Sequence, residues 1–179
     1  MGINQLKKDV FSDDWELVKS SISKLAKIGG DEITLFLIEL LEQKESGIRN
    51  RAALALEELK DNRAVEPLIE AIKKPENHEY NGTMVFALES LNCSDKIVEI
   101  FRILFEETYE SKVSANAILE EQEFEYDKDD YDKVAKFWEH CNANKEKYPG
   151  FDDLETYEMM KENYELFEQT VKRNPTDNK

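Results

Sequence analysis

An apolar pattern that recurs along the chain is the feature that most constrains its fold. A shift of 31 residues places Leu25 on Leu56, and a further shift of 32 residues carries Leu56 to Leu88. The other apolar pairs related by these shifts are Ile28 and Leu59, Leu37 and Leu68, Ile38 and Ile69, Leu41 and Ile72, Leu59 and Leu91, Val65 and Ile97, Leu68 and Ile100, Ile69 and Phe101, and Ile72 and Leu104. Periods between about 20 and 50 residues are typical of stacked repeats, whose units bury their apolar faces only against neighbours. The sequence therefore predicts an all-α fold, a short right-handed α-solenoid of stacked helical hairpins rather than a single bundle.

Capping signals and a glycine mark the ends of predicted helices. Asp13 precedes Glu16 by three residues, which is the spacing of a capping box, and predicts that a helix starts there. Gly29 is placed to end this helix, because glycine adopts the backbone conformations that terminate helices at no steric cost. Asp152 and Glu155 repeat the capping-box spacing and predict the start of a later helix.

One segment, residues 48–72, has the sequence IRNRAALALEELKDNRAVEPLIEAI. It resembles the HEAT repeat, specifically the short variety also found in phycobilin lyases. The residues that carry the resemblance are Ala52, Ala53, Ala55, Leu56, Leu59, Asp61, Ala64, Val65, Leu68 and Ile69. Residues 13–45 and 79–108 match only in their apolar positions. The resemblance implies an α-solenoid that mostly binds proteins, occasionally binds nucleic acid and is rarely catalytic. Asp61 is placed to cap the helix that follows it.

The rest of the chain departs from this repeat. We expect a single α-solenoid domain over residues 1–179, with HEAT-like repeats at about 12–110. Residues 111–173 are predicted to form a divergent repeat and capping helices, because a solenoid needs a closed end. The final residues, 174–179, are expected to be a frayed tail.

The charge of the chain limits its possible partners. Asp and Glu number 40 against 24 Lys and Arg, which gives a formal net charge of -16 and a pI of about 4.6. Such a field repels nucleic acid and anionic lipid and speeds encounter with a basic protein, although it also confers solubility. Arg49 and Arg51 are the only basic pair on the second helix of a hairpin, which argues against a DNA-binding groove. We therefore expect no direct nucleic-acid partner and no membrane partner.

The cysteines and the N-terminus bear on localisation. Cys93 and Cys141 form no C-x-x-C pair, which is typical of a reduced cytosolic protein. The N-terminal residues lack the apolar run of a signal peptide, and no segment approaches the length of a membrane span. We expect a cytoplasmic protein and favour a monomer.

No arrangement of residues predicts catalysis or metal binding. His140 and Cys141 are neighbours on a predicted helix and point about 100° apart, so they do not face each other. No glycine-rich phosphate loop or nucleophile elbow is present. The tract DKDDYD at 127–132 resembles the start of a calcium loop, but Asp132 replaces the required glycine and Trp138 replaces the bidentate glutamate. We expect no enzyme activity, no cofactor and no metal.

An acidic segment with interleaved aromatic residues, residues 120–132, is one candidate binding surface. Its acids are Glu120, Glu121, Glu123, Glu125, Asp127, Asp129, Asp130 and Asp132. Phe124, Tyr126 and Tyr131 lie among them, and Lys128 is the one base. Carboxylates can meet Lys or Arg of a partner while aromatic rings supply contact area at low entropic cost. The alternatives are a solvated loop and rings that pack against the terminal helices.

Equivalent positions of consecutive repeats form a second candidate surface. The predicted row consists of Leu54 and Phe86, of Glu57 and Glu89, and of Glu120 or Glu121 as its continuation. Stacked repeats align such positions along one concave face. The alternative is that Leu54 and Phe86 pack into adjacent helices. The candidate partner-binding residues are Leu54, Glu57, Phe86, Glu89, Glu121, Glu123, Phe124, Glu125, Tyr126, Asp127, Asp129, Asp130 and Tyr131.

These features predict a non-enzymatic module that binds another protein, a basic one, through a concave apolar and acidic face. A specific version is an immunity-type inhibitor of a basic toxin such as a nuclease, since some bacterial immunity proteins resemble short HEAT arrays. The first alternative is a general adaptor or regulatory scaffold that binds peptides. The second, implied by the resemblance to phycobilin lyases, is a chromophore-handling protein.

Overall fold

The computed structural model describes residues 2–173, and the predicted tail at 174–179 lies outside the described residues. The chain divides into two compact units, unit 1 (Met1–Asn92) and unit 2 (Cys93–Lys179). All regular secondary structure between residues 2 and 173 is helical, with ten α-helices and three short 3-10 helices. The predicted all-α fold is confirmed. The division falls inside the stretch predicted as HEAT-like, so residues 93–110 belong to unit 2.

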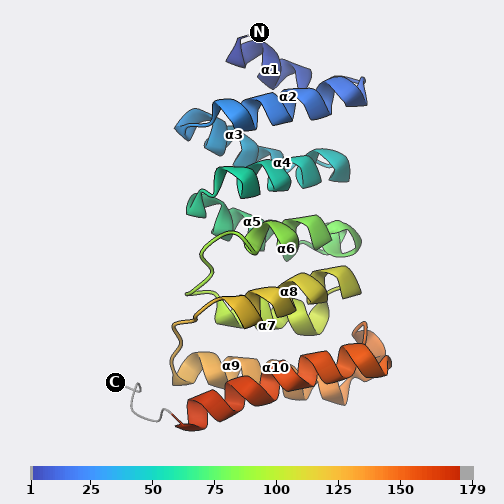
Figure 1. Cartoon of the computed structure of the whole chain (residues 1–179). Coiled ribbons are helices and arrows are strands. Elements are labelled where there is room, and N and C mark those ends of the chain that lie inside the picture. The colour runs from blue at the N-terminus through green and yellow to red at the C-terminus, as the bar shows by residue number, and fades with distance from the viewer. Residues whose placement is uncertain (1, 174–179) are drawn as a thin grey trace. The chain divides into compact units, whose positions relative to one another are not determined.

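Unit 1 is built from stacked pairs of helices. Its elements are α1 (Ile3–Asp9), α2 (Trp15–Ile28), α3 (Asp31–Leu40), α4 (Ser46–Leu59), η1 (Asn62–Ala64), α5 (Val65–Ile72), η2 (Pro75–Tyr80) and α6 (Gly82–Leu88). Helices α2, α4 and α6 lie side by side (Figure 1), and α3 packs on α4 while α5 packs on α6. This arrangement is the stack of helical hairpins that the repeated apolar pattern predicts.

The repeated apolar positions form the core of unit 1. Leu25, Leu56 and Leu88, which the repeat register makes equivalent, are all fully buried. Burial of each such side chain contributes roughly 1.5 to 3 kcal/mol. Ala52 of α4 is also fully buried, and its small side chain lets neighbouring helices approach closely. Ile28 departs from the pattern, because it is the last residue of α2 and is exposed.

The N-terminal cap of α2 differs from the prediction by one residue. Asp14, not Asp13, is the capping residue, and its Oδ1 accepts hydrogen bonds from the backbone N–H groups of Glu16 and Leu17. The helix starts at Trp15, so the residue directly before it holds the cap position. The predicted helix end is confirmed, since Gly29 follows the last helical residue with a φ of 64°.

An aspartate and an arginine connect the turns of consecutive hairpins in unit 1. Asp61 caps the 3-10 turn after α4 by accepting the N–H of Arg63, so the predicted capping role of Asp61 is confirmed. The Arg63 guanidinium donates to Asp61 and, through Nη2 at 2.8 Å, to Asp31 at the start of α3. Its hydrogen bonds lower the pKa of Asp61 to about 2. The pair therefore ties one hairpin to the next.

Unit 2 has longer helices and an aromatic core. It contains α7 (Ile97–Glu106), α8 (Tyr109–Glu121), α9 (Lys128–Ala143), η3 (Lys145–Lys147) and α10 (Leu154–Arg173). Helix α7 packs on α8 and α9, and α10 packs on the same two helices. Trp138 of α9 contacts four aromatic rings at centroid distances between 5.2 and 5.9 Å, those of Phe105, Phe151, Tyr157 and Tyr164.

The start of α10 also corrects a predicted cap. Asp153, not Asp152, lies directly before the helix, and its Oδ1 accepts the N–H of Thr156 at 2.8 Å. This hydrogen bond lowers the pKa of Asp153. As at α2, the spacing to the following glutamate places the cap one residue too early, because only the backbone geometry decides which N–H groups are left without partners.

Candidate protein-binding surfaces

The four predicted surface residues of unit 1 lie on or directly beside two neighbouring helices. Leu54 and Glu57 are three residues apart on one side of α4, Phe86 lies on α6, and Glu89 directly follows α6. The Phe86 side chain is 46% exposed, and Leu54 and Glu57 are half-buried. Because α4 and α6 pack side by side, these residues form an apolar and acidic surface, which we call the α4–α6 surface.

A hydrogen bond between the two helices organises this surface. Ser90 Oγ donates to Glu57 Oε1 at 3.0 Å. The bond holds the Glu57 carboxylate in place between the last turn of α4 and the residues after α6, while its second oxygen can still accept a hydrogen bond. Glu57 therefore has a structural role in addition to its predicted binding role.

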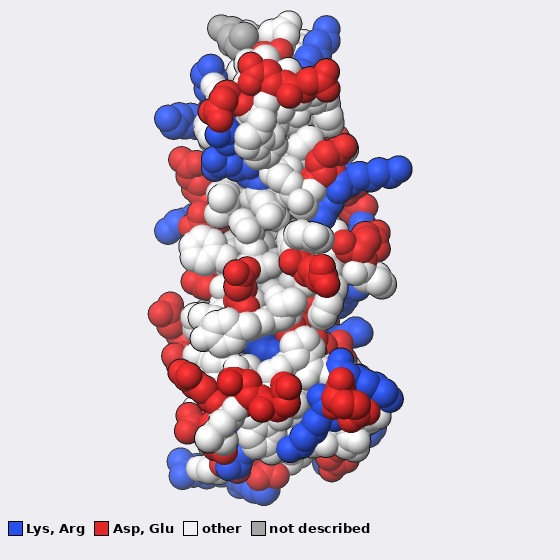
Figure 2. All heavy atoms as spheres, turned by 90° about the vertical axis from the view of Figure 1, so that its right-hand side faces the viewer, with Lys and Arg blue, Asp and Glu red and all other residues white. Residues whose placement is uncertain are grey.

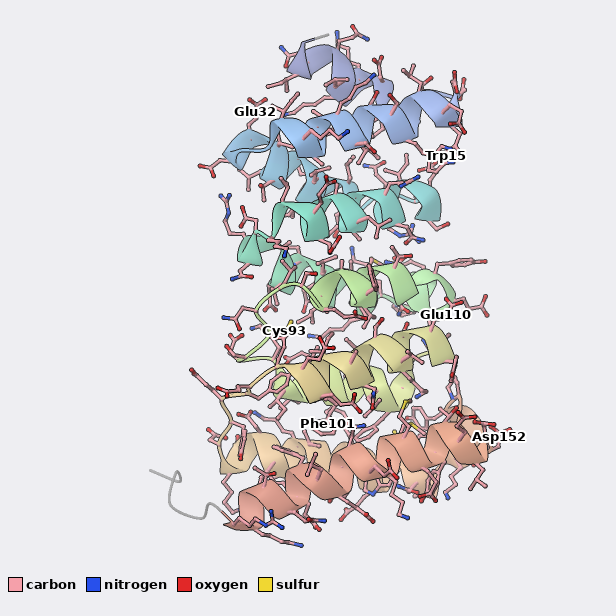
Figure 3. All side chains as sticks on the ribbon, viewed as in Figure 1. Trp15, Glu32, Cys93, Phe101, Glu110 and Asp152 are labelled. Atoms are coloured by element: carbon pink, nitrogen blue, oxygen red, sulfur yellow. The ribbon has the colours of Figure 1, made fainter. Side chains whose placement is uncertain are left out.

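Trp15 is an exposed aromatic residue of unit 1 that the predicted surface does not include. It is the first residue of α2 and lies at the end of that helix in Figure 3. Its ring packs over Gly47 of α4, where an added Cβ would lie 2.8 Å from the ring. The repeat register gave no signal for this contact, because the 31-residue shift that relates Leu25 to Leu56 places Trp15 on Ser46 and not on Gly47.

In unit 2 the acidic segment divides into two parts with different roles. The aspartates of its second part, residues 127–132, cap the N-terminus of α9 or form ion pairs with lysines of that helix. Asp127 Oδ1 accepts the N–H groups of Asp129 and Asp130, and Asp130 Oδ2 accepts the N–H of Asp127, which completes a capping box. Asp132 pairs with Lys128 at 2.7 Å, and Lys133 lies 3.2 Å from Asp130. These carboxylates stabilise the start of α9.

Two of the three aromatic residues of the segment pack against α10. The ring of Tyr126 lies 5.0 Å from that of Phe167, edge to face, and the ring of Tyr131 lies 6.0 Å from it. The Tyr131 hydroxyl donates to Glu168 at 3.2 Å. For these two rings the structure shows the packing alternative that the sequence left open.

The first part of the segment borders a cleft of about 540 Å³ within unit 2, lined by more apolar than polar side chains, which we call the α8–α10 cleft. Its lining residues are Ile97, Phe101, Leu119, Gln122, Glu123, Phe124, Tyr126, Asn163, Leu166, Phe167 and Thr170. Phe101 of α7 lies on the side of that helix facing α9 and α10 (Figure 3), and its ring is 5.1 Å from that of Phe167. Both rings are buried, whereas Leu166 is 64% exposed. Sequence analysis found only three of these residues, because the others come from three separate helices.

The glutamates of this first part differ from the aspartates of α9. Glu121, Glu123 and Glu125 are exposed, and no ion pair involves them among residues 2–173. No Lys or Arg occurs between Lys112 and Lys128. On the face drawn in Figure 2, too, carboxylates lie among uncharged side chains.

The described residues show no metal or membrane feature. No group of three or more His, Cys, Asp or Glu side chains between residues 2 and 173 could hold a metal ion. None of the helices in that range has the length and hydropathy needed to cross a bilayer. Both thiols are buried, and burial raises the pKa of Cys93 to about 12 and of Cys141 to about 11. They lack the thiolate character of reactive cysteines.

Comparison with known families finds a match within the first half of the chain. Residues 3–89 match the family of HEAT repeats. The match is just under half of the chain and covers helices α1 to α6, which include the α4–α6 surface. HEAT repeats generally mediate protein–protein interactions and are typically non-catalytic scaffolds. No curated protein matches the chain.

Proposed function

We propose that the protein is a non-enzymatic module that binds a basic partner protein through apolar and acidic surfaces. The observation that carries the proposal is the α4–α6 surface, where Phe86 is exposed beside Leu54 and two glutamates on adjacent helices of the HEAT region. An exposed aromatic ring next to carboxylates suits a partner with both apolar and cationic side chains. The net charge of -16 supports a basic partner, because it attracts such a protein over a distance.

The more specific form of the proposal is an inhibitor of a basic toxin such as a nuclease. A nuclease binds phosphates in a cationic groove, and carboxylates presented by this protein would occupy that groove with electrostatic steering. An adaptor that binds extended peptides differs in one measurable respect. An inhibitor should bind the folded toxin and suppress its activity in equimolar amounts, whereas an adaptor should bind short peptides of its partner equally well.

The test starts from affinity capture in the native cell and continues with the purified partner. We expect a basic protein whose association rate falls steeply with ionic strength. Phe86→Ala combined with Leu54→Ala should weaken binding at least about tenfold, as loss of interface anchors does. Leu35→Ala, at an exposed leucine of α3 in the same unit, is the matched control and should bind normally. A partner that binds the double variant as tightly as the unchanged protein would contradict the proposed surface.

A further inference from the structure

Unit 2 carries a second surface that is suited to a more closely defined partner. We propose that the α8–α10 cleft binds the apolar side of a basic amphipathic helix of the partner protein. One or more large apolar side chains would lie against Phe101, Leu166 and Phe167, and adjacent Lys or Arg side chains would meet the glutamates at the edge. This inference rests on the proposed function. It describes the part of the partner that would bind unit 2, whereas the α4–α6 surface belongs to unit 1.

The apolar part of the argument comes from the wall that α10 contributes. Asn163, Leu166, Phe167 and Thr170 line the cleft at positions i, i+3, i+4 and i+7. They form a stripe of about two helical turns, roughly 10 Å long. Amphipathic helices present their anchor residues with this same spacing to apolar grooves. The wall is therefore long enough for about two turns of such a helix to lie along it.

The cleft combines a fixed interior with an open apolar edge. Asn163 Nδ2 donates to Asn116 Oδ1 of α8 at 2.6 Å, which ties the two helices together at one end of the wall. Phe101 and Phe167 are buried and in ring contact. Leu166 is exposed although it lies beside these rings. An aliphatic side chain exposed at the edge of an apolar cleft is characteristic of a binding groove.

The glutamates at the edge of the cleft favour a basic occupant. Glu123 is the one charged residue in the lining of the cleft, and Glu120, Glu121 and Glu125 beside it are exposed without an ion pair among the described residues. The nearest bases along the chain are already paired. Lys172, two residues beyond Thr170, lies 2.8 Å from Glu168, and Lys96, next to Ile97, lies 3.2 Å from Asp95. The edge of the cleft thus carries negative charge that the protein does not neutralise itself.

The probe for the test is a synthetic helical peptide of leucine and lysine with all leucines on one face. Two control peptides keep its length, one with the same residues scrambled so that no apolar face forms, and one with glutamate in place of lysine. Each is titrated into the full-length protein, and the backbone amide chemical shifts are followed by NMR. We expect the amphipathic Leu/Lys peptide alone to bind, with shift changes concentrated at the residues that line the cleft.

Matched variants localise the binding. Leu166→Ser should weaken binding of the peptide at least about tenfold, whereas Leu154→Ser, at a leucine of the same helix that is 75% exposed and outside the cleft, should leave it unchanged. Glu123→Gln with Glu125→Gln should weaken binding and reduce its salt dependence. Glu139→Gln with Glu146→Gln, at exposed glutamates outside the cleft, removes the same charge and should have little effect.

Several results would overturn this assignment. They are equal binding of the scrambled or the glutamate peptide, equal effects of the serine variants at Leu166 and Leu154, or shift changes outside the cleft. A large gain of peptide affinity after removal of residues 174–179 would assign the cleft to the end of the chain itself. The two proposals fail separately, because capture of a partner that depends on Phe86 tests unit 1, whereas the peptide titration tests unit 2.

Discussion

The two units bury their side chains in different ways. Unit 1 repeats an aliphatic pattern, in which Leu25, Leu56 and Leu88 occupy equivalent positions and Ala52 spaces the helices. Unit 2 instead gathers aromatic rings from distant parts of the chain around Trp138 and Phe167. A repeated aliphatic core can be recognised from spacing alone, because every repeat has the same neighbours. An aromatic cluster assembled from three helices and the loops beside them has no such period.

Each unit also buries one long cationic side chain, and the two differ in chemistry. Arg49 and Lys112 are the only buried charged residues between residues 2 and 173, with 4% and 0% exposure. Arg49 Nη1 donates to the carbonyl oxygens of Gln43 and Lys44, just after α3. Lys112 Nζ donates at 2.8 Å to the carbonyl oxygen of Leu104 on α7. Both satisfy carbonyls near the end of a helix, but only lysine can lose its proton within the folded protein.

The largest effect should come from disrupting the aromatic cluster of unit 2. Trp138→Ala removes the ring that contacts four others and should lower the free energy of unfolding of unit 2 by about 3 kcal/mol, the low end for such substitutions because the ring is half-buried. Lys136→Ala, at an exposed residue of the same helix, is the control. Hydrogen exchange of amides in α7 to α10 measures the change. A loss below 1 kcal/mol would show that the cluster is not the core of this unit.

A smaller loss should follow from replacing the buried arginine of unit 1. Arg49→Met keeps an apolar stem but leaves the carbonyls of Gln43 and Lys44 without their donor, which should cost about 1.5 to 3 kcal/mol. Arg51→Met on the same helix, at a half-buried residue, should change stability by less than about 0.5 kcal/mol. Urea unfolding of both variants provides the comparison. Equal effects of the two substitutions would contradict the role assigned to Arg49.

The buried lysine should make unit 2 respond to alkaline pH. Burial lowers the pKa of Lys112 to about 8, below its ordinary value of 10.5. Between these values the unfolded chain binds more protons than the folded one, so this group makes stability increase with pH. The difference in unfolding free energy between the unchanged protein and Lys112→Met should shift by about 1 kcal/mol in favour of the unchanged protein from pH 7 to pH 9.

This comparison isolates the lysine from the two thiols. The raised pKa values of Cys93 and Cys141 act in the opposite direction above about pH 9, because the folded state then retains protons that the unfolded chain loses. Both thiols are present in the unchanged protein and in the variant, so the contribution of Cys93 cancels. The charge of Lys112 lowers the pKa of Cys141, so the comparison is made no higher than pH 9, below the range in which Cys141 titrates in the folded protein. A difference that stays constant with pH would mean that Lys112 is not desolvated.

The smallest loss of stability is expected in unit 1, from replacing Asp61, and it should diminish at acidic pH. The Arg63 hydrogen bonds hold the pKa of Asp61 at about 2, below its ordinary value of 3.8. The stabilisation is therefore complete above pH 4 and is lost as the pH falls through 2. Because water screens this surface pair, Asp61→Asn should cost only about 0.5 kcal/mol at neutral pH and progressively less as the pH falls through 2. Acid unfolding curves of the two proteins test this difference.

The candidate surface of unit 1 could be predicted from regular spacing, whereas that of unit 2 depends on contacts between distant segments. Leu54 and Phe86 were predicted as surface residues from the repeat register, because equivalent positions of stacked helices face the same way. The acidic segment was found from composition, but composition does not separate Asp127, which caps α9, from Glu123, which borders the cleft. Leu166 was missed, because it lies one position away from the buried stripe of α10 and its exposure depends on helices far away in the sequence.

The sequence by itself determined the helical class, the repeat length and the aliphatic core of unit 1, because these follow from spacing within and between adjacent helices. Only the tertiary structure decided which aspartates cap α2 and α10, that Arg49 and Lys112 are buried, and that Phe101, Leu166 and Phe167 meet at one cleft. The physical reason is the distance along the sequence between the residues that interact. Periodicity records which side of a helix is buried, whereas hydrogen bonds to free carbonyls and contacts between distant aromatic rings depend on how whole helices pack.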